Sequence, residues 1–288
     1  MKNQTLEIIF NRSSCRNFSE RKVSQNDLEE MIAAGLSAPS SGNFQAYSII
    51  HVTDAEKKAR LAQLSYNQKF IEKAPVVLLF CIDFRRMKQL ASKYPFPLRN
   101  ADSFTELWFI LMEIGMVMQN MCIAAESKGM KSICVGNPIS YMEELSKLCQ
   151  LPSYVCPALI LCIGYPAQEK KPMNKYAGSL LVHENVYRDV LNQDLEASFQ
   201  EHFKNWKKPL SEESLQAFSE SCKAWSGESF ENYAVNQIRK QGYFNYYQYF
   251  ISIFYRETPD MMTNTDYHKY FKNQGFNWLE TDSPNRKI

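Results

Sequence analysis

The segment NRSSCRNF, residues 11–18, places two arginines four residues apart with two serine hydroxyls between them. Guanidinium groups and hydroxyls at this spacing can hold a phosphate dianion through charge-assisted hydrogen bonds, some of them bidentate. Two arginines near a helix end are also typical of a solvated helix face. Arg12 and Arg16 alone therefore do not decide between a phosphate site and an ordinary surface.

A second polar segment, LSAPSSGNFQAY at residues 36–47, is rich in small hydrogen-bonding groups for its length. Its hydroxyls and side-chain amides include those of Ser40, Ser41, Asn43 and Gln45. Gly42 lets the backbone approach a ligand closely, although the same residue types also make plain polar turns. The segment is either a connector or a binding surface.

A third candidate is SICVGNPIS, in which Gly136 ends an apolar run. A glycine at a strand end is a common place for backbone groups to meet a ligand, and it is also a common turn. The sequence contains none of the stronger signatures, G-x-x-x-x-G-K-[ST], G-x-G-x-x-G, G-x-S-x-G or H-E-x-x-H. Function must therefore be sought in these three weaker segments.

The elements that position these segments follow from the apolar periodicity. Leu28, Met31 and Gly35 have helical spacing, which predicts a helix over residues 25–36 with Ser24 as its N-cap. Pro39 cannot extend this helix, so the second segment follows its end. Further helices are predicted over residues 3–11, 54–63, 103–128 and 142–149, and strands over AYSIIHV, VVLLFCID, KSICVG and ALILCIG. The unbroken apolar run VVLLFCID indicates a central strand covered on both faces.

This order of elements predicts a layered α/β or α+β domain over residues 1–188. From residue 189 the strand-like runs end, and residues 189–288 are predicted to form a mostly helical extension. Its aromatic cluster, GYFNYYQYFISIFY, is expected to pack on the first domain or on a partner subunit. The cluster has no basic stripe, which disfavours the stacking of nucleic-acid bases.

Composition narrows the classes of protein. The formal net charge is +2 in 288 residues, without the clustered basic excess of a nucleic-acid-binding protein. The 8 cysteines lie mostly in apolar runs and have no C-x-x-C spacing, which predicts reduced core thiols in a cytoplasmic protein. The 4 histidines are scattered, so no metal site is expected.

No membrane segment is predicted either. The apolar run at the N-terminus is too short for a signal peptide. The most apolar segment, LWFILMEIGMVMQNMCIAA, is interrupted by Glu113, Gln119 and Asn120. Because a membrane span has few or no charges, we interpret this segment as a buried helix.

The three segments are more informative together, in this order and at this spacing, than each is alone. R-S-S-x-R-x-F at residues 12–18 precedes A-P-S-S-G-N-x-Q at residues 38–45, and then come the KAPVVLLF strand, a helix, the glycine turn and G-Y-P with basic residues after it. In this combination residues 5–188 resemble the nitroreductase family of FMN-dependent oxidoreductases. The C-terminal segment is similar to an extension in some longer members.

The resemblance implies an α+β fold with a central mixed β-sheet flanked by helices. It also implies a homodimer in which FMN lies at the subunit interface and touches both chains. The residues that would hold the phosphate and the ribityl chain are Arg12, Ser13, Ser14 and Arg16. Those that would line the flavin and its side chain are Pro39, Ser40, Ser41 and Asn43. Asn67 matches a polar contact to the flavin ring, and Gly136 lies near the turn whose backbone N–H faces the reactive flavin nitrogen.

The chain also departs from the family pattern. Ala46 and Tyr47 stand where members carry proline and tryptophan, and Ser13 stands in place of a second arginine. After G-Y-P, members carry a lysine–arginine pair that reaches the phosphate. The lysines that follow here are Lys170, Lys171 and Lys175. We assign the phosphate contact to Lys175.

The activity implied by the resemblance is transfer of two electrons from NADH or NADPH, through FMN, to a nitroaromatic, quinone or flavin acceptor by a ping-pong mechanism. This chemistry belongs to the cofactor. No side-chain acid or base is demanded, and no catalytic residue is assigned. Two alternatives stay open: a flavin-binding store or sensor without turnover, and a specialised member that dehalogenates, dehydrogenates or fragments flavin.

Overall fold

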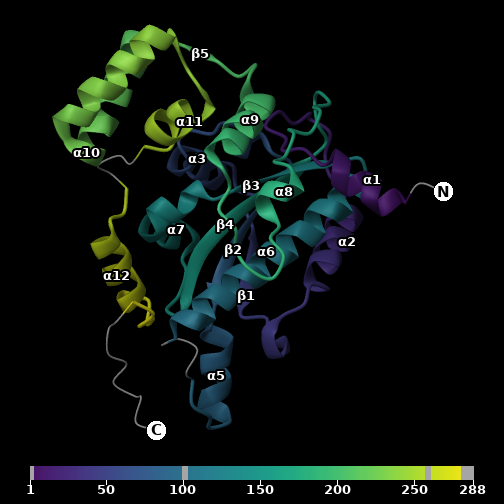
Figure 1. The fold of residues 1–288 in the computed structure, drawn as a ribbon. Helices are drawn as coiled ribbons and strands as arrows, with labels where there is room; N and C mark the ends of the chain where they lie inside the picture. Colours follow the sequence, from purple (N-terminus) through teal and green to yellow (C-terminus); the bar gives the residue numbers. More distant parts are fainter. Residues whose placement is uncertain (1–2, 99–102, 257–260, 280–288) are drawn as a thin grey trace. The chain divides into compact units, whose positions relative to one another are not determined.

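The computed structural model describes residues 3–98, 103–256 and 261–279 (Figure 1). The chain divides into two compact units. The first, here called the core unit, holds the described residues up to Pro172 and those from Met261 onward. The second, the helical unit, spans Met173–Asp260. Each unit is described by itself.

The core unit contains a four-stranded sheet in the order β1-β2-β4-β3. Its strands are β1 (Tyr47–His51), β2 (Val76–Asp83), β3 (Lys131–Val135) and β4 (Val155–Gly164). All three neighbouring pairs are antiparallel, and an isolated parallel bridge joins Ser14 to Ser132. The predicted mixed sheet is thus antiparallel in its described strands. Buried apolar runs indicate that a strand is covered and carry no information on its direction.

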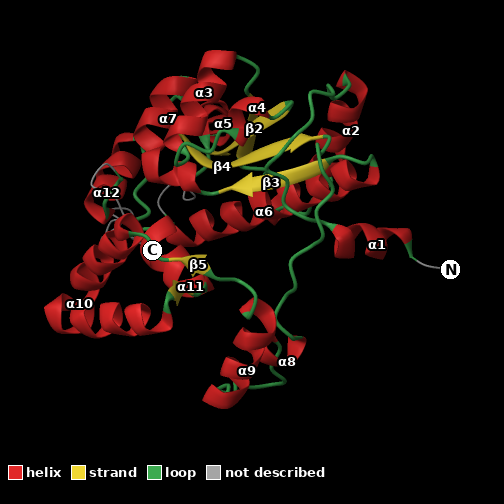
Figure 2. Cartoon of the chain, turned by 90° about the horizontal axis from the view of Figure 1, so that it is seen from above, coloured by secondary structure: helices red, strands yellow, loops and turns green. Residues whose placement is uncertain are grey.

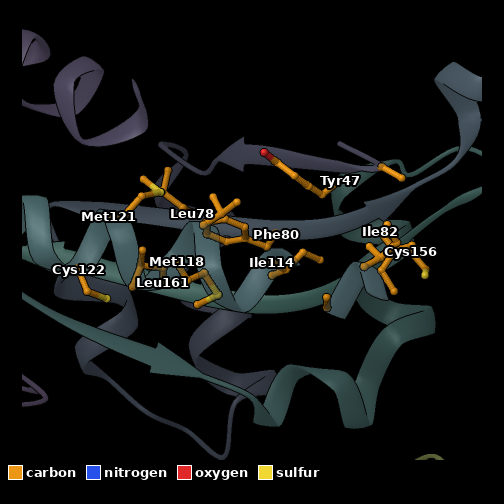
Figure 3. Close-up of a cluster of buried hydrophobic side chains, with 14 of the residues drawn as sticks. Tyr47, Leu78, Phe80, Ile82, Ile114, Met118, Met121, Cys122, Cys156 and Leu161 are labelled. Atoms are coloured by element: carbon orange, nitrogen blue, oxygen red, sulfur yellow. The ribbon is translucent and has the colours of Figure 1, made fainter. Parts of the chain in front are cut away.

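Helices cover both faces of this sheet, as Figure 2 shows. Every residue of β2 is buried, as expected for a central strand, and its side chains alternate between two apolar clusters. Leu78, Phe80 and Ile82 face α2 (Gln25–Leu36), α6 (Phe104–Ser127) and α12 (Asn264–Asn273), and part of this cluster appears in Figure 3. The opposite face packs against α3 (Ala55–Leu64), α4 (Phe70–Lys73) and α7 (Met142–Cys149). The remaining helices are α1 (Gln4–Asn11) and α5 (Arg85–Lys93).

Helix α2 is fixed at both ends, which matters because it carries the second polar segment. The Ser24 hydroxyl accepts the N–H of Asp27 at 3.0 Å, confirming the predicted N-cap. Near the other end α2 crosses α6 closely at Gly35, where an added Cβ would lie 2.5 Å from Cγ of Met121. Only glycine permits this approach without a shift of the neighbouring side chain.

Strand β4 contains a proline, which a central strand rarely tolerates. The register between β2 and β4 shifts between Phe80 and Cys81, where Cys81 pairs with Pro157. The extra residue of this bulge is Ala158, beside the proline. Proline has no N–H to donate to the ladder, and within a sheet it is tolerated at such a local break in the pairing.

The helical unit consists of short elements and one long broken helix. These are α8 (Gly178–Leu181), α9 (Asn192–Phe203), β5 (Lys208–Pro209), α10 (Glu212–Gln241), β6 (Tyr243–Phe244), α11 (Tyr246–Tyr249) and the π-helical turn η4 (Phe250–Phe254). Helix α10 is interrupted at Ser226 and Gly227, where Gly227 has φ +79°. Phe218 from its first half and Ile238 from its second half share one apolar cluster, so α10 is a helical hairpin.

The boundary between the units differs from the predicted division between residues 188 and 189. The chain returns to the core unit after residue 260, where aromatic side chains of the last described segment pack in the core. Phe276 and Trp278 stack with ring centroids 3.9 Å apart inside the α6-side cluster. The N–H of Tyr154 donates to the carbonyl of Gln274 at 2.7 Å, which fixes the segment to the start of β4.

Among the described residues, α6 is the one helix that is long and apolar enough to cross a membrane by length and composition alone. Part of α6 is buried against α2 and the sheet. This is the arrangement expected for a core helix.

Candidate functional site

The N-terminal motif lies along the edge of the sheet. The N–H of Cys15 donates to the carbonyl of Ser132 at 3.0 Å, and the N–H of Ala167 donates to the carbonyl of Asn17 at 3.0 Å. The motif is therefore held between β3 and the chain that leaves β4. An edge strand offers unpaired backbone groups, and this segment satisfies some of those of β3.

This arrangement encloses a cavity of about 120 Å³, here called the cationic pocket. Its lining residues are Ser13, Ser14, Cys15, Arg16, Asn17, Lys131, Pro166, Gln168 and Lys170. The Ser13 hydroxyl donates to the carbonyl of Lys170 at 3.1 Å, which ties the motif to the segment after G-Y-P. Three cationic side chains and two serine hydroxyls thus line one small hollow, which suits a phosphate group.

Lys131 is held in place by a partner. Its Nζ lies 2.5 Å from Oε2 of Glu126 in a pair that is mostly buried, with side-chain exposures of 12% and 5%. Burial raises the pKa of Glu126, and the hydrogen bond from Lys131 opposes that rise. A bound anion in the pocket would therefore share Lys131 with a carboxylate.

Arg12 does not line the cationic pocket. Its Nε is buried and has no hydrogen-bond partner among the described residues. The guanidinium lies beside the thiol of Cys122, whose pKa is lowered, first by a hydrogen bond from Cys134 and also by the Arg12 charge. Arg12 is thus a half-buried cation of the predicted phosphate motif, and its buried Nε has unused donor capacity.

The second motif forms a loop over an open hollow of about 560 Å³, here called the loop hollow. The hollow is lined by Pro39, Ser40, Ser41, Phe109, Met112, Glu113, Gly115, Met116 and Gln119. The loop contains the short 3₁₀ turn η1 (Ser41–Asn43), in which Gly42 has φ +54°. Asn43 and Gln45 also take positive φ, 56° and 50°. Left-handed backbone is uncommon for residues other than glycine, so the loop has a strained shape.

Glu113 is the buried polar group of the loop hollow. Its Oε1 accepts the N–H of Ser41 at 2.7 Å, and its Oε2 has no hydrogen-bond partner among the described residues. Burial raises the pKa of this carboxyl, and the hydrogen bond from Ser41 opposes the rise. Burial, and then the Glu113 charge, also raise the pKa of Tyr47, whose buried hydroxyl likewise lacks a partner in the described chain.

The other predicted site residues lie outside both hollows. Asn67 is exposed between α3 and α4 with φ 54°. Gly136 is exposed at the start of the 3₁₀ turn η3 (Asn137–Tyr141) with φ −93°, and an added Cβ would meet only Cδ2 of Leu159 at 3.7 Å. Asn43 lies in the loop but does not line its hollow. Lys175 belongs to the helical unit, whereas Lys170 lines the cationic pocket.

The predicted residues that do line a hollow are therefore divided between two places. The segment with Ser13, Ser14 and Arg16 precedes the N-terminal end of α2, and the loop with Ser40 and Ser41 follows the C-terminal end of α2 (Figure 1). A helix of 12 residues spans about 18 Å.

Helix α6 presents an apolar stripe beside the loop hollow. Phe104, Trp108, Met112 and Met116 recur every four residues and are between 38% and 58% exposed. A contiguous apolar surface of this kind is typical of an interaction face.

Two of the residues in these hollows were not singled out as site residues from the sequence. Lys131 looks like an ordinary surface lysine, and only the bridge between Ser14 and Ser132 brings it to the motif. Glu113 did leave a signal, because it interrupts the most apolar segment of the chain. A charge in an otherwise buried helix is costly unless it has a specific contact.

The fold and its two hollows define an α+β protein suited to an anionic ligand that also has a large, partly apolar body. The chain belongs to the nitroreductase family, which its residues 9–165 match. It is 33% identical over 196 residues to an NADPH-flavin oxidoreductase of Vibrio harveyi, a match that covers 68% of this chain and 79% of that protein. It is 28% identical over 244 residues to an FMN reductase (NAD(P)H) of Bacillus subtilis strain 168, covering 84% and 98%.

A solved structure shares nearly the whole fold. The crystal structure of nitroreductase A from Vibrio parahaemolyticus has a TM-score of 0.72 and 26% identity, covering 96% of this chain and 99% of that one. The resemblance stated from the sequence and the predicted fold class are thereby confirmed. The protein is an oxidoreductase of the nitroreductase family, and its relatives include flavin reductases that use NADPH or NAD(P)H.

Proposed function

We propose that the protein is a cytoplasmic, homodimeric FMN-dependent NAD(P)H oxidoreductase that passes two electrons to a nitroaromatic, quinone or flavin acceptor by a ping-pong mechanism. The observation that carries the proposal is the cationic pocket, in which Arg16, Lys131 and Lys170 surround two serine hydroxyls. The relatives described above are flavin reductases and a nitroreductase, which supports the same class of reaction.

The donor set of the cationic pocket fits the phosphate of FMN. Arg16 and the serines supply directional hydrogen bonds, and Lys131 and Lys170 supply charge. Arg12 adds a guanidinium whose buried Nε has no partner among the described residues, as expected of a group that binds an anion. Ser13 replaces a family arginine, and the two lysines compensate for the lost charge.

Two lysines are candidates for the contact with the FMN phosphate. Lys170 is held beside Ser13 through its carbonyl and lines the pocket, which supports it as a phosphate contact. Lys175, assigned from the family pattern, lies in the other unit. Substituting each lysine by methionine and measuring FMN affinity distinguishes them, since only the residue that contacts the phosphate should weaken binding.

The flavin and its side chain would be lined by residues of the second motif, which are Pro39, Ser40, Ser41 and Asn43. Because α2 separates the two motifs within one chain, a site that uses both is completed most simply by a second copy. The apolar stripe on α6 borders the loop hollow and is suited to pack against that copy. This supports a homodimer with FMN at its interface and with contacts from both chains.

Bound FMN would supply the redox chemistry, accepting a hydride from the nicotinamide and delivering two electrons to the acceptor. The chain's own residues bind and orient the cofactor, and no catalytic acid or base is assigned. Gly136 leaves its position open to a ligand, because an added Cβ meets no protein atom closer than 3.7 Å. Asn67 is exposed and available for a polar contact to the ring.

The test is an absorption spectrum of the purified protein, followed by anaerobic titration with NADH and then NADPH. We expect a yellow protein whose visible absorbance bleaches on addition of one or both donors. A colourless protein that takes up no FMN would refute the proposal. A yellow protein that neither donor reduces would instead indicate a flavin store or sensor.

A further inference from the structure

The loop between α2 and β1, residues 37–46, is held to the core unit by side chains from two other helices. The Glu113 carboxylate on α6 accepts the N–H of Ser41 at 2.7 Å. The Arg86 guanidinium on α5 donates to the carbonyl of Gln45 at 2.6 Å. These contacts hold the two ends of the strained turn.

The turn between these two contacts has a shape that needs support. Gly42, Asn43 and Gln45 all have positive φ, and two of them are not glycine. Such backbone costs energy and persists only where the surroundings determine it. The side chain of Glu113 can therefore influence the conformation of the loop at Ser40 and Ser41.

Burying the Glu113 carboxylate in the core is unfavourable for stability. Glu113 is 2% exposed in an apolar helix, and its Oε2 has no partner among the described residues. A buried carboxylate that is only half satisfied costs stability, and an apolar side chain would pack there at lower cost. The hydrogen bond from Ser41 to Glu113 is a contact that an apolar side chain could not make.

We propose that Glu113 is a positioning residue, whose carboxylate fixes the backbone of Ser41 and thereby prepares Ser40 and Ser41 to meet the flavin. This inference rests on the proposed function, since it concerns the loop assigned to FMN. A loop already ordered in its binding shape loses less entropy when the ligand binds. Glu113 therefore contributes to cofactor affinity without touching the cofactor.

The test compares Glu113→Gln and Glu113→Ala with a control, Glu144→Gln, that removes the same charge from an exposed position on α7. Glutamine keeps an acceptor but loses the charge that strengthens the bond from Ser41. We expect the FMN dissociation constant to rise about fivefold in Glu113→Gln and at least about tenfold in Glu113→Ala. Glu144→Gln should bind as the wild type does.

Two further measurements separate positioning from a general effect on the fold. The visible spectrum of FMN bound to Glu113→Gln should be shifted, because the loop beside the ring changes. The melting temperature of the apoprotein and its molar mass in solution should not fall. A Glu113→Gln protein that binds poorly because it is unfolded or monomeric would overturn the positioning role.

The outcomes also distinguish this inference from the proposed function. If the wild type takes up no FMN, the proposed function fails. If the wild type binds FMN and both Glu113 variants match it in affinity and spectrum, the positioning role alone is refuted.

Discussion

Replacing Met112 with glutamate should dissociate the proposed homodimer and thereby abolish FMN binding. Met112 is 50% exposed at the middle of the apolar stripe on α6, between Trp108 and Met116, and it lines the loop hollow. In a two-fold dimer the same face is used by both copies, so each substitution acts twice. Because Met112 is already half exposed, the variant subunit should still fold.

The size of the effect can be worked out from this exposure. Burying a whole methionine side chain is worth about 1.5–3 kcal/mol. Half of Met112 remains to be covered, so each copy contributes about 1 kcal/mol and the dimer about 2 kcal/mol. Placing a carboxylate in an apolar interface adds at least about 1 kcal/mol more. Since 1.4 kcal/mol is a factor of ten, the dimer dissociation constant should rise at least about 100-fold.

The assay is size-exclusion chromatography with light scattering, together with FMN binding followed by quenching of flavin fluorescence. Leu90→Glu is the matched control, because Leu90 is 51% exposed and lies on α5 and not on α6. We expect the control to remain a dimer that binds FMN. A monomeric Met112→Glu protein with wild-type FMN affinity would refute the composite site. A variant that stays dimeric would refute α6 as the interface.

Three further predictions concern the phosphate motif, the glycine turn and Glu113. Replacing both Arg12 and Arg16 with alanine should weaken FMN binding at least about 100-fold, since each charge-assisted contact is worth about 1.5–3 kcal/mol; yellow colour retained after dialysis would count against the phosphate assignment. Gly136→Ala should leave the melting temperature unchanged, because its Cβ meets only Leu159 at 3.7 Å, yet weaken FMN binding about tenfold by crowding the flavin; unchanged affinity in a calorimetric titration would contradict a close approach there. Burial raises the pKa of Glu113 above its ordinary value of 4.5. Between these two pKa values the folded protein keeps a proton that the unfolded chain releases, so the free energy of unfolding falls as the pH rises through this range. Apoprotein of Glu113→Gln should therefore gain more in melting temperature over the wild type at pH 8 than at pH 5, and a gain independent of pH would contradict a buried charge.

Local structure was predictable where one residue type has one physical consequence. Ser24 before a periodic apolar run marked the start of α2, and the unbroken apolar run of β2 indicated a strand covered on both faces; both are confirmed. The direction of the strands was not predictable, because burial depends on the covering layers and not on which way a neighbour runs. The return of Phe276 and Trp278 to the core unit was also missed, since long-range packing leaves no local periodicity.

The candidate site was predictable in its parts but not in their arrangement. Residue type identified the hydroxyl and guanidinium groups near Ser14 and the hydroxyls near Ser41. The sequence alone could not place Lys131 in the same pocket as Ser14, because that proximity depends on a backbone bridge at the edge of β3. It also could not pair Glu113 with Ser41, which lies 72 residues away along the chain.

The residues that depart from the family pattern lie in different environments, some in the core and one in the cationic pocket. Ala46 and Tyr47 are buried, 1% and 4% exposed, and pack in the cluster around Phe80 shown in Figure 3. They alter the core beneath the loop. Tyr47 also contacts the loop, because its N–H donates to the carbonyl of Gln45 at 2.7 Å, and its hydroxyl, which has no partner among the described residues, lies near Glu113. Ser13, by contrast, lines the cationic pocket, where a missing guanidinium changes what a ligand meets directly. The change at Ser13 should therefore alter phosphate affinity, and the change at Tyr47 should alter the stability of the loop.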